Sequence, residues 1–210
     1  MSAPSGPRPG IPVTRRAVVA GLAALCAAPA AADPGIRHAS SLIVAARCQV
    51  GQTLRYDPAY TALPFPGGDV PRGKGVCTDV LIRAYRDAFG LDLQALVNAD
   101  MRRAFAAYPR NWGLKGPDRN IDHRRVPNLQ AFFLRQHARL PVPRDPAGWQ
   151  PGDIFTSLIG GRLPHTGIVS DRGGGSRAGY VIHNIGNGTR EEAALFDHPL
   201  TGRYRWALSG

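Results

Sequence analysis

The hydrophobic pattern of this chain changes its period about two thirds of the way along. Before that point apolar residues recur at helical spacing, whereas the last third consists of short β-branched and aromatic runs between glycine-rich turns. The runs are DIFTSLI, TGIVS, YVIHNI and RYRWAL, and one of the turns reads RGGGSRAG. Helices followed by consecutive short strands predict an α+β fold, with N-terminal helices and a C-terminal antiparallel sheet.

Four helices are expected before the strands. They are predicted at residues 38 to 52, 77 to 90 and 92 to 108, with a fourth that starts near residue 127. Gly90 is the natural stop of the second helix. The segment from 56 to 75 is rich in proline and glycine and is predicted to be a loop, the kind of segment that positions functional groups.

The N-terminus has the features of an export signal. Two arginines at positions 15 and 16 precede the uncharged run AVVAGLAALCAAPAAA, which ends in small residues. The run is too short and too rich in alanine for a membrane span. We therefore predict a twin-arginine signal peptide over residues 1–32, one domain over residues 33–210, and a periplasmic location. Cys26 leaves a lipoprotein-type cleavage open.

Composition limits the classes of partner. The chain has 210 residues, of which 43% are hydrophobic, enough for a packed core. Its formal net charge is +11, and removal of the signal peptide with its three arginines lowers this to +8. The basic residues are mostly scattered arginines without a nucleic-acid-binding motif, so we expect no nucleic acid as partner. A basic surface is compatible with anionic wall polymers.

Cys77 is the strongest candidate for a reactive residue. It lies in GKGVCTDVLIRAYRDAF, where the glycine-rich approach gives way to an amphipathic helix. Aligned N–H dipoles at a helix start favour a thiolate, so we expect the pKa of Cys77 to be lowered. His165 in LPHTGIVSD and His183 in GYVIHNIG follow in strand-like sequence. Together the three residues indicate a cysteine nucleophile with a histidine base.

Other roles for these residues remain open at this point. In an oxidising compartment Cys77 could form a disulfide with Cys48, although the helical pattern around Cys48 favours a buried free thiol. Zinc could bind Cys77, His165 and His183, but the intervals of 88 and 18 residues lack the short-spaced ligand pair that most zinc sites contain. We therefore expect no metal and no cofactor.

The order of the motifs resembles that of a known family. A loop with Tyr56, Gly67 and Gly68 precedes the cysteine at the helix start, and the strings QPGDIF, PHTGIVSD and VIHN follow. This order is similar to that of the NlpC-type cell-wall peptidases of the papain-like superfamily. GGDVPRGKGVCTDV, NIDHRRVPNL and PHTGIVSD most closely resemble an uncharacterised bacterial branch, domain of unknown function 1287. The resemblance implies a papain-like α+β fold in which the cysteine-bearing helix packs on the sheet.

The resemblance also implies roles for individual residues. Cys77 would be the nucleophile and His165 the general base. The family's third polar residue, which orients the histidine, falls on His183 or Asn184, whose side chains must point to opposite faces of a strand. We favour His183, because it shares the strand parity that makes Val181 and Ile185 core-facing.

Neighbouring residues complete the expected site. The backbone N–H of Cys77 and the hydroxyl of Tyr56 would donate to an oxyanion. Gly167 would leave room for the cysteine-bearing helix on the face of His165. Asp79 departs from the sequence usual in these peptidases, and it either opposes thiolate formation or caps free N–H groups at the helix start.

Two polar residues are expected outside the catalytic set. His123 would anchor a loop beside Asp122, and Asp153 would be a turn residue before a strand.

The function predicted from the sequence is that of an exported cysteine hydrolase. It would cleave amide or peptide bonds, in peptidoglycan stem peptides by resemblance, through an acyl-enzyme on Cys77 with His165 as base. Two alternatives remain: a non-catalytic wall-binding or assembly module on a degenerate peptidase fold, and a papain-like acyltransferase.

Overall fold

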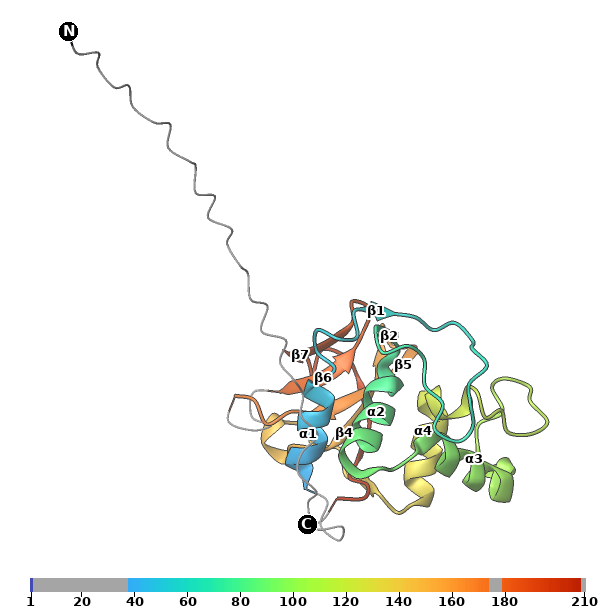
Figure 1. Cartoon of the computed structure of the whole chain (residues 1–210). Coiled ribbons are helices and arrows are strands. Elements are labelled where there is room, and N and C mark those ends of the chain that lie inside the picture. Colours follow the sequence, from blue (N-terminus) through green and yellow to red (C-terminus); the bar gives the residue numbers. More distant parts are fainter. Residues whose placement is uncertain (2–37, 174–178, 209–210) are drawn as a thin grey trace.

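The computed structural model describes Met1, residues 38–173 and residues 179–208. The predicted signal peptide therefore lies, apart from Met1, outside the described residues. Within the described part, helices precede an antiparallel sheet, which confirms the predicted mixture and its order (Figure 1). No helix in residues 38–173 or 179–208 is long and apolar enough to cross a membrane.

The helices occupy most of the first half of the chain. They are α1 (Ala39–Arg47), α2 (Cys77–Phe89), α3 (Leu93–Ala104) and α4 (Val126–Arg135), with the 3-10 helices η1 (Phe105–Ala107), η2 (Asp122–Arg124) and η3 (Pro146–Gly148). Gly90 ends α2 with a φ of 66°, a left-handed conformation that glycine adopts without strain. Asp92 caps α3 by accepting a 3.0 Å hydrogen bond from the Gln94 backbone N–H. The first helix is shorter than predicted, because the chain turns after Arg47 toward Gly51.

The strands form two sheets. β1 (Arg55–Tyr56) and β2 (Lys74–Gly75) form a short parallel pair. The main sheet has the order β3-β8-β4-β5-β6-β7, and every pair in it is antiparallel. Its strands are β3 (Arg139–Leu140), β4 (Ile154–Ile159), β5 (Leu163–Val169), β6 (Tyr180–Asn184), β7 (Thr189–Ala193) and β8 (Leu200–Tyr204).

Two strands differ from the prediction. The sequence of β7, TREEA, has no apolar alternation and was not expected to be a strand, but it pairs along the outer edge of β6. The last strand was predicted in RYRWAL, whereas β8 ends at Tyr204 and the apolar residues after it pack against the helices. These residues gain burial by leaving the sheet.

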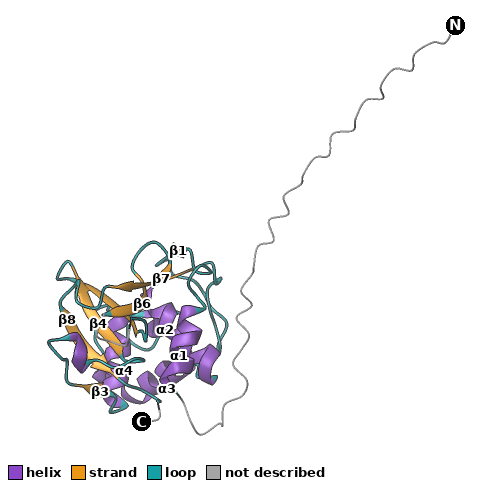
Figure 2. Cartoon of the chain, turned by 90° about the vertical axis from the view of Figure 1, so that its left-hand side faces the viewer, coloured by secondary structure: helices purple, strands orange, loops and turns teal. Residues whose placement is uncertain are grey.

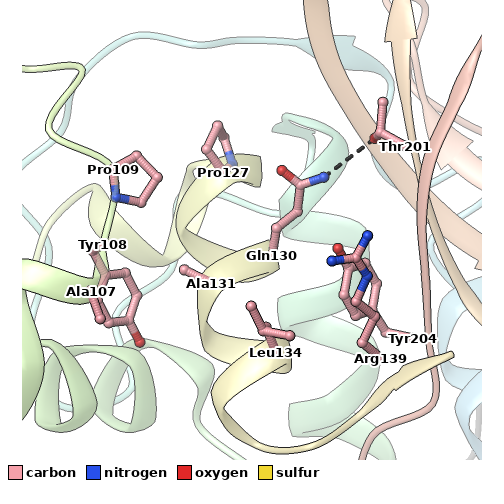
Figure 3. A pocket seen from close by; sticks show the side chains of 10 residues that line it. All are labelled: Ala107, Tyr108, Pro109, Pro127, Gln130, Ala131, Leu134, Arg139, Thr201 and Tyr204. Carbon is pink, nitrogen blue, oxygen red and sulfur yellow. Dashed lines mark hydrogen bonds between the residues drawn. The ribbon is translucent and has the colours of Figure 1, made fainter.

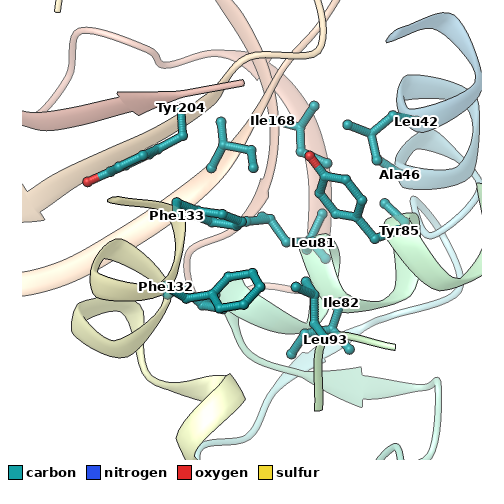
Figure 4. Packing of buried hydrophobic residues seen from close by; sticks show 14 of the residues in the cluster. Leu42, Ala46, Leu81, Ile82, Tyr85, Leu93, Phe132, Phe133, Ile168 and Tyr204 are labelled. Carbon is teal, nitrogen blue, oxygen red and sulfur yellow. The ribbon is translucent and has the colours of Figure 1, made fainter. Parts of the chain in front are cut away.

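Both faces of the sheet are buried. Ile154, Ile168 and Ile182 face α1 to α4 and belong to the larger core. Their sequence neighbours face the other way and form a smaller core, made of Phe155, Val169 and Val181 with Trp149 and Leu195. Figure 2 shows the helices gathered on one side of the strands, and Figure 4 shows α2 and α4 meeting the sheet through Leu81, Phe133 and Tyr204.

Candidate functional site

Cys77 is the first residue of α2, directly after β2. The loop before it returns to the helix start because a buried arginine, Arg83, holds it. The Arg83 guanidinium donates to the Asp69 carboxylate and to the carbonyl oxygens of Val70 and Lys74, at 2.9 to 3.1 Å. A charged residue on the inner face of a predicted helix, here Arg83 one turn after Val80, indicates such an anchor. Arg83 was not among the residues predicted for the site.

The same loop brings Tyr56 to Cys77. Tyr56 pairs with Gly75 in the short parallel sheet, two residues before the cysteine. Burial raises the pKa of the Tyr56 hydroxyl, and the charge of the nearby Cys77 and a hydrogen bond to it raise that pKa further. The expected neighbour of Cys77 is therefore in place, 21 positions away in sequence but adjacent in space.

Burial dominates the protonation of Cys77. The side chain is 4% exposed, and burial raises the pKa of the thiol from 9.0 to about 11. The backbone N–H groups of Thr166, Thr78 and Cys77 itself are directed at the sulfur and lower its pKa, while the charge of Asp79 raises it. The predicted lowering of the pKa is therefore wrong for this arrangement, because loss of hydration outweighs the N–H groups at the helix start.

Asp79 caps the helix that Cys77 begins, in addition to raising the pKa of the thiol. Its carboxylate accepts a 2.7 Å hydrogen bond from the Val76 N–H at the start of α2. It also receives two hydrogen bonds of 2.9 Å from the guanidinium of Arg124 in η2. Both side chains are almost fully buried. Both roles considered for Asp79 are present: it caps the helix start and its charge opposes the thiolate, and an ion pair accompanies them.

His165 and His183 lie together. Nε2 of His165 and Nδ1 of His183 are 2.9 Å apart, and Nε2 of His183 is 3.0 Å from Oε1 of Glu192 on β7. Burial lowers the pKa of His165 to about 3, helped by His183 and His198. Burial also lowers the pKa of His183, although Glu192 opposes that shift. Sequence reasoning missed Glu192 because it did not identify β7.

The histidine pair lies on the other face of the sheet from α2. The rings of His165 and His183 contact Phe155 of the smaller core. Gly167 shares this face: a Cβ there would meet Phe155 and His183, so the glycine makes room for the histidines and not for the helix. Within the described chain no hydrogen bond joins Cys77 to His165, and the two side chains line different pockets.

Asn184, the alternative third residue, lies on the side of Cys77. It is fully buried, and its Nδ2 donates a 3.0 Å hydrogen bond to the carbonyl oxygen of Gly75 in β2. Asn184 and His183 thus point to opposite faces of β6, as strand alternation requires. Ile185, which was expected in the core, lies just beyond β6 and is exposed.

The remaining candidates have structural surroundings. Cys77 is a free thiol, while Cys48 is disulfide-bonded and half-buried at the end of α1, so the two cysteines do not pair and Cys48 is not a buried free thiol. His123 is buried in η2, and burial lowers its pKa to about 4. Asp153 precedes β4, as expected of a turn residue, and also pairs with Arg203 and Arg205. Residues 38–173 and 179–208 hold no cluster of ligands suited to a metal ion.

Cys77 lines a pocket of about 430 Å³. The wall of this pocket includes Tyr56, Trp112, Arg124 and Arg162. The Arg125 guanidinium lies 4.0 Å from the centroid of the Trp112 ring. The pocket thus offers an aromatic surface, basic groups and a neutral thiol beside backbone N–H donors. This combination can hold a polar chain against the sulfur.

Comparison with known proteins gives three results. Residues 43–206 match the family described as Domain of unknown function (DUF1287). The chain is 50% identical over 161 residues to "Uncharacterized protein YijF" of Escherichia coli (strain K12), which covers 77% of this chain and 78% of that protein. A solved structure, "Structure of NlpC2 from Trichomonas vaginalis", matches with a TM-score of 0.39 and 14% identity, over 79% of this chain and 46% of that one.

Proposed function

The chain belongs to the DUF1287 family, and we propose that it is a cysteine hydrolase that cleaves amide bonds through an acyl-enzyme on Cys77. One observation carries the proposal: a free thiol at the first residue of a helix, with backbone N–H groups that lower its pKa, lines an open pocket. N–H groups in this position stabilise negative charge, first on the sulfur and then on the oxygen of a tetrahedral intermediate. A purely structural cysteine does not require them.

The reaction proceeds in two steps. The sulfur attacks the amide carbonyl carbon while its proton passes to a base, and the protonated base then gives that proton to the leaving amine. The resulting thioester is hydrolysed by water, which releases the carboxylic acid and restores the thiol. Tyr56, whose hydroxyl adjoins the sulfur, is a further donor for the oxyanion.

His165 is the base in this proposal, although its ring faces His183 at rest. Its backbone lies between Pro164, which lines the Cys77 pocket, and Thr166, whose N–H is directed at the sulfur. β6 pairs with β5 from Gly167 to Val169, so at His165 β5 is paired with β4 and not with β6. We infer that the Ser157–His165 pairing of β4 and β5 opens when substrate occupies the pocket, because rotation of the side chain alone cannot carry the ring across the sheet to Cys77.

The proposed substrates are peptidoglycan stem peptides. The enzyme would reach them in the periplasm after export by the twin-arginine route. The motif order described above and the signal-like N-terminus support this assignment. The same acyl-enzyme also permits transfer to an amine in place of water.

A non-catalytic wall-binding module is the second candidate. The separation of Cys77 from His165 favours it, together with the raised pKa of the thiol and the lowered pKa of the imidazole. In such a module the pocket would hold a wall peptide without cleaving it.

Replacement of Cys77 and His165 tests the two candidates. We expect Cys77→Ala to abolish release of amino groups from purified stem peptides, measured by mass spectrometry. His165→Ala should lower kcat by about 10²- to 10⁴-fold because the base is lost. His137→Ala, at an exposed histidine, is the matched control.

Each outcome has a separate meaning. Turnover by Cys77→Ala would refute the acyl-enzyme. Full activity of His165→Ala beside an inactive Cys77→Ala would refute only the base. Binding of stem peptides by the wild-type protein without any turnover would identify the module.

A further inference from the structure

A second pocket adjoins the one that contains Cys77. It measures about 460 Å³, and Pro127 at the start of α4 lines both pockets. The chain segment that supplies Tyr108 and Pro109 to the second pocket continues directly into Asn111 and Trp112 of the first. The two pockets are therefore neighbours that meet at Pro127, and together we call them the groove.

The second pocket has an apolar side and a polar end. Figure 3 shows Ala107 and Pro109 at one end and Arg139 beside Tyr204 at the other, with Gln130 between them. Nε2 of Gln130 donates to the hydroxyl oxygens of Thr156, at 2.9 Å, and Thr201, at 3.3 Å. Hydroxyl, amide and guanidinium groups thus gather at the end that is remote from Cys77.

The net charge of this groove is positive. Its lining contains Arg124, Arg139 and Arg162 but no aspartate or glutamate. Arg124 is neutralised by Asp79. Arg139 and Arg162 are exposed, and neither has an ion pair with any residue in the described ranges. Two unpaired guanidinium groups at separate points of one groove match a ligand with separated anionic groups.

We propose that this groove binds a peptide that carries carboxylates, with Arg162 holding one near Cys77 and Arg139 holding another at the far end. The inference rests on the proposed function, because the groove is taken as the substrate site of Cys77. Arg139 and Arg162 are specificity-determining residues and take no part in bond cleavage.

The length of the groove places the second carboxylate. Pro127 and Leu134 mark its extent along α4, which corresponds to about 10 Å at the rise of an α-helix. An extended peptide advances about 3.3 Å per residue. The carboxylate that meets Arg139 therefore lies about three residues beyond the point near Pro127 where the peptide leaves the pocket of Cys77.

The test measures binding separately from cleavage. The probe is a stem tetrapeptide purified from bacterial sacculi, used either with its free carboxylates or after their conversion to amides. Calorimetric titration of the Cys77→Ala protein gives affinity without turnover. The tested variant adds Arg139→Gln, Arg139→Lys restores the charge, and Arg144→Gln at an exposed arginine outside the groove is the matched control.

We expect Arg139→Gln to weaken binding of the carboxylate peptide about tenfold, the usual effect of losing a charge-assisted hydrogen bond. Its affinity for the amidated peptide should not change, Arg139→Lys should recover part of the loss, and Arg144→Gln should bind normally. Equal binding of both peptides, an unchanged affinity in Arg139→Gln, or no binding to either peptide would overturn the inference.

The two proposals can fail separately. If binding depends on Arg139 but the wild-type protein never cleaves the peptide, the hydrolase proposal is refuted and the peptide-binding groove is supported. If the wild-type protein cleaves the peptide and Arg139→Gln binds it normally, the hydrolase proposal is supported and the role of Arg139 in the groove is refuted.

Discussion

Burial and backbone N–H groups act on the Cys77 thiol in opposite directions. The N–H groups of Thr166 and Thr78 favour the thiolate, but the side chain is almost fully removed from water, which favours the thiol. On the other face of the sheet, the buried imidazole of His165 is neutral above about pH 3, because burial lowers its pKa. The resting site therefore stores no thiolate–imidazolium pair, and any activity requires a change that joins the two groups.

Alkylation of Cys77 tests this resting state. Because burial raises its pKa from 9.0 to about 11, the rate of reaction with iodoacetamide should rise with a midpoint near pH 11 in the folded protein. When the protein is unfolded in urea, the pKa of this thiol should return to about 8.5. Mass spectrometry of peptides identifies the modified cysteine, and a midpoint below 8.5 in the folded protein would contradict the burial argument.

At the scale of elements, one buried ion pair joins two segments of the site. Asp79 in the first turn of α2 and Arg124 in η2 are 2.9 Å apart, and Thr78 adds a hydrogen bond of 2.9 Å to the Arg124 carbonyl oxygen. The sequence strings GVCTDV and NIDHRR thus meet in space. Hydrophobic spacing predicted that α2 exists, but an ion pair 45 residues apart leaves no periodic signal.

Removal of Asp79 should be costly. Asp79→Ala leaves the Arg124 guanidinium buried without its partner and the Val76 N–H without an acceptor, so we expect the free energy of unfolding to fall by about 3–5 kcal/mol. Asp87→Ala on the same helix is the matched control. Its pair with Arg72 is 2.7 Å long and more exposed, and its loss should change the stability by about 0–1 kcal/mol. Urea unfolding measures both, and equal losses would refute the distinction.

At the scale of the whole molecule, buried neutral histidines link stability to pH. Burial lowers the pKa of His123 to about 4 and that of His165 to about 3. The unfolded chain binds protons at these side chains below about pH 6.5, whereas the folded chain does not. The contribution of these neutral histidines to the free energy of unfolding is therefore complete above about pH 6.5, and it is lost progressively as the pH falls toward about 3.

Urea unfolding between pH 7 and pH 5 measures this linkage. The free energy of unfolding should decrease as the pH falls, with a slope that approaches the uptake of about two protons on unfolding, or about 2.7 kcal/mol per pH unit. His123→Asn should reduce that slope by about one proton while circular dichroism at pH 7 remains that of the native protein. A slope that His123→Asn leaves unchanged would assign the effect to other groups.

The sequence by itself determined the helices, the antiparallel sheet and the placement of Cys77 at the start of α2, because periodicity, glycine stops and turn residues act locally. Strand alternation likewise predicted that His183 and Asn184 point to opposite faces. Only the tertiary structure decided which face the helices cover. Both faces of the sheet are apolar, with Ile168 on one and Val169 on the other. The alternation of side chains along a strand therefore does not predict which face lies toward Cys77. The protonation of the thiol was decided in the same way, since the loss of water around Cys77 depends on every segment that packs over it.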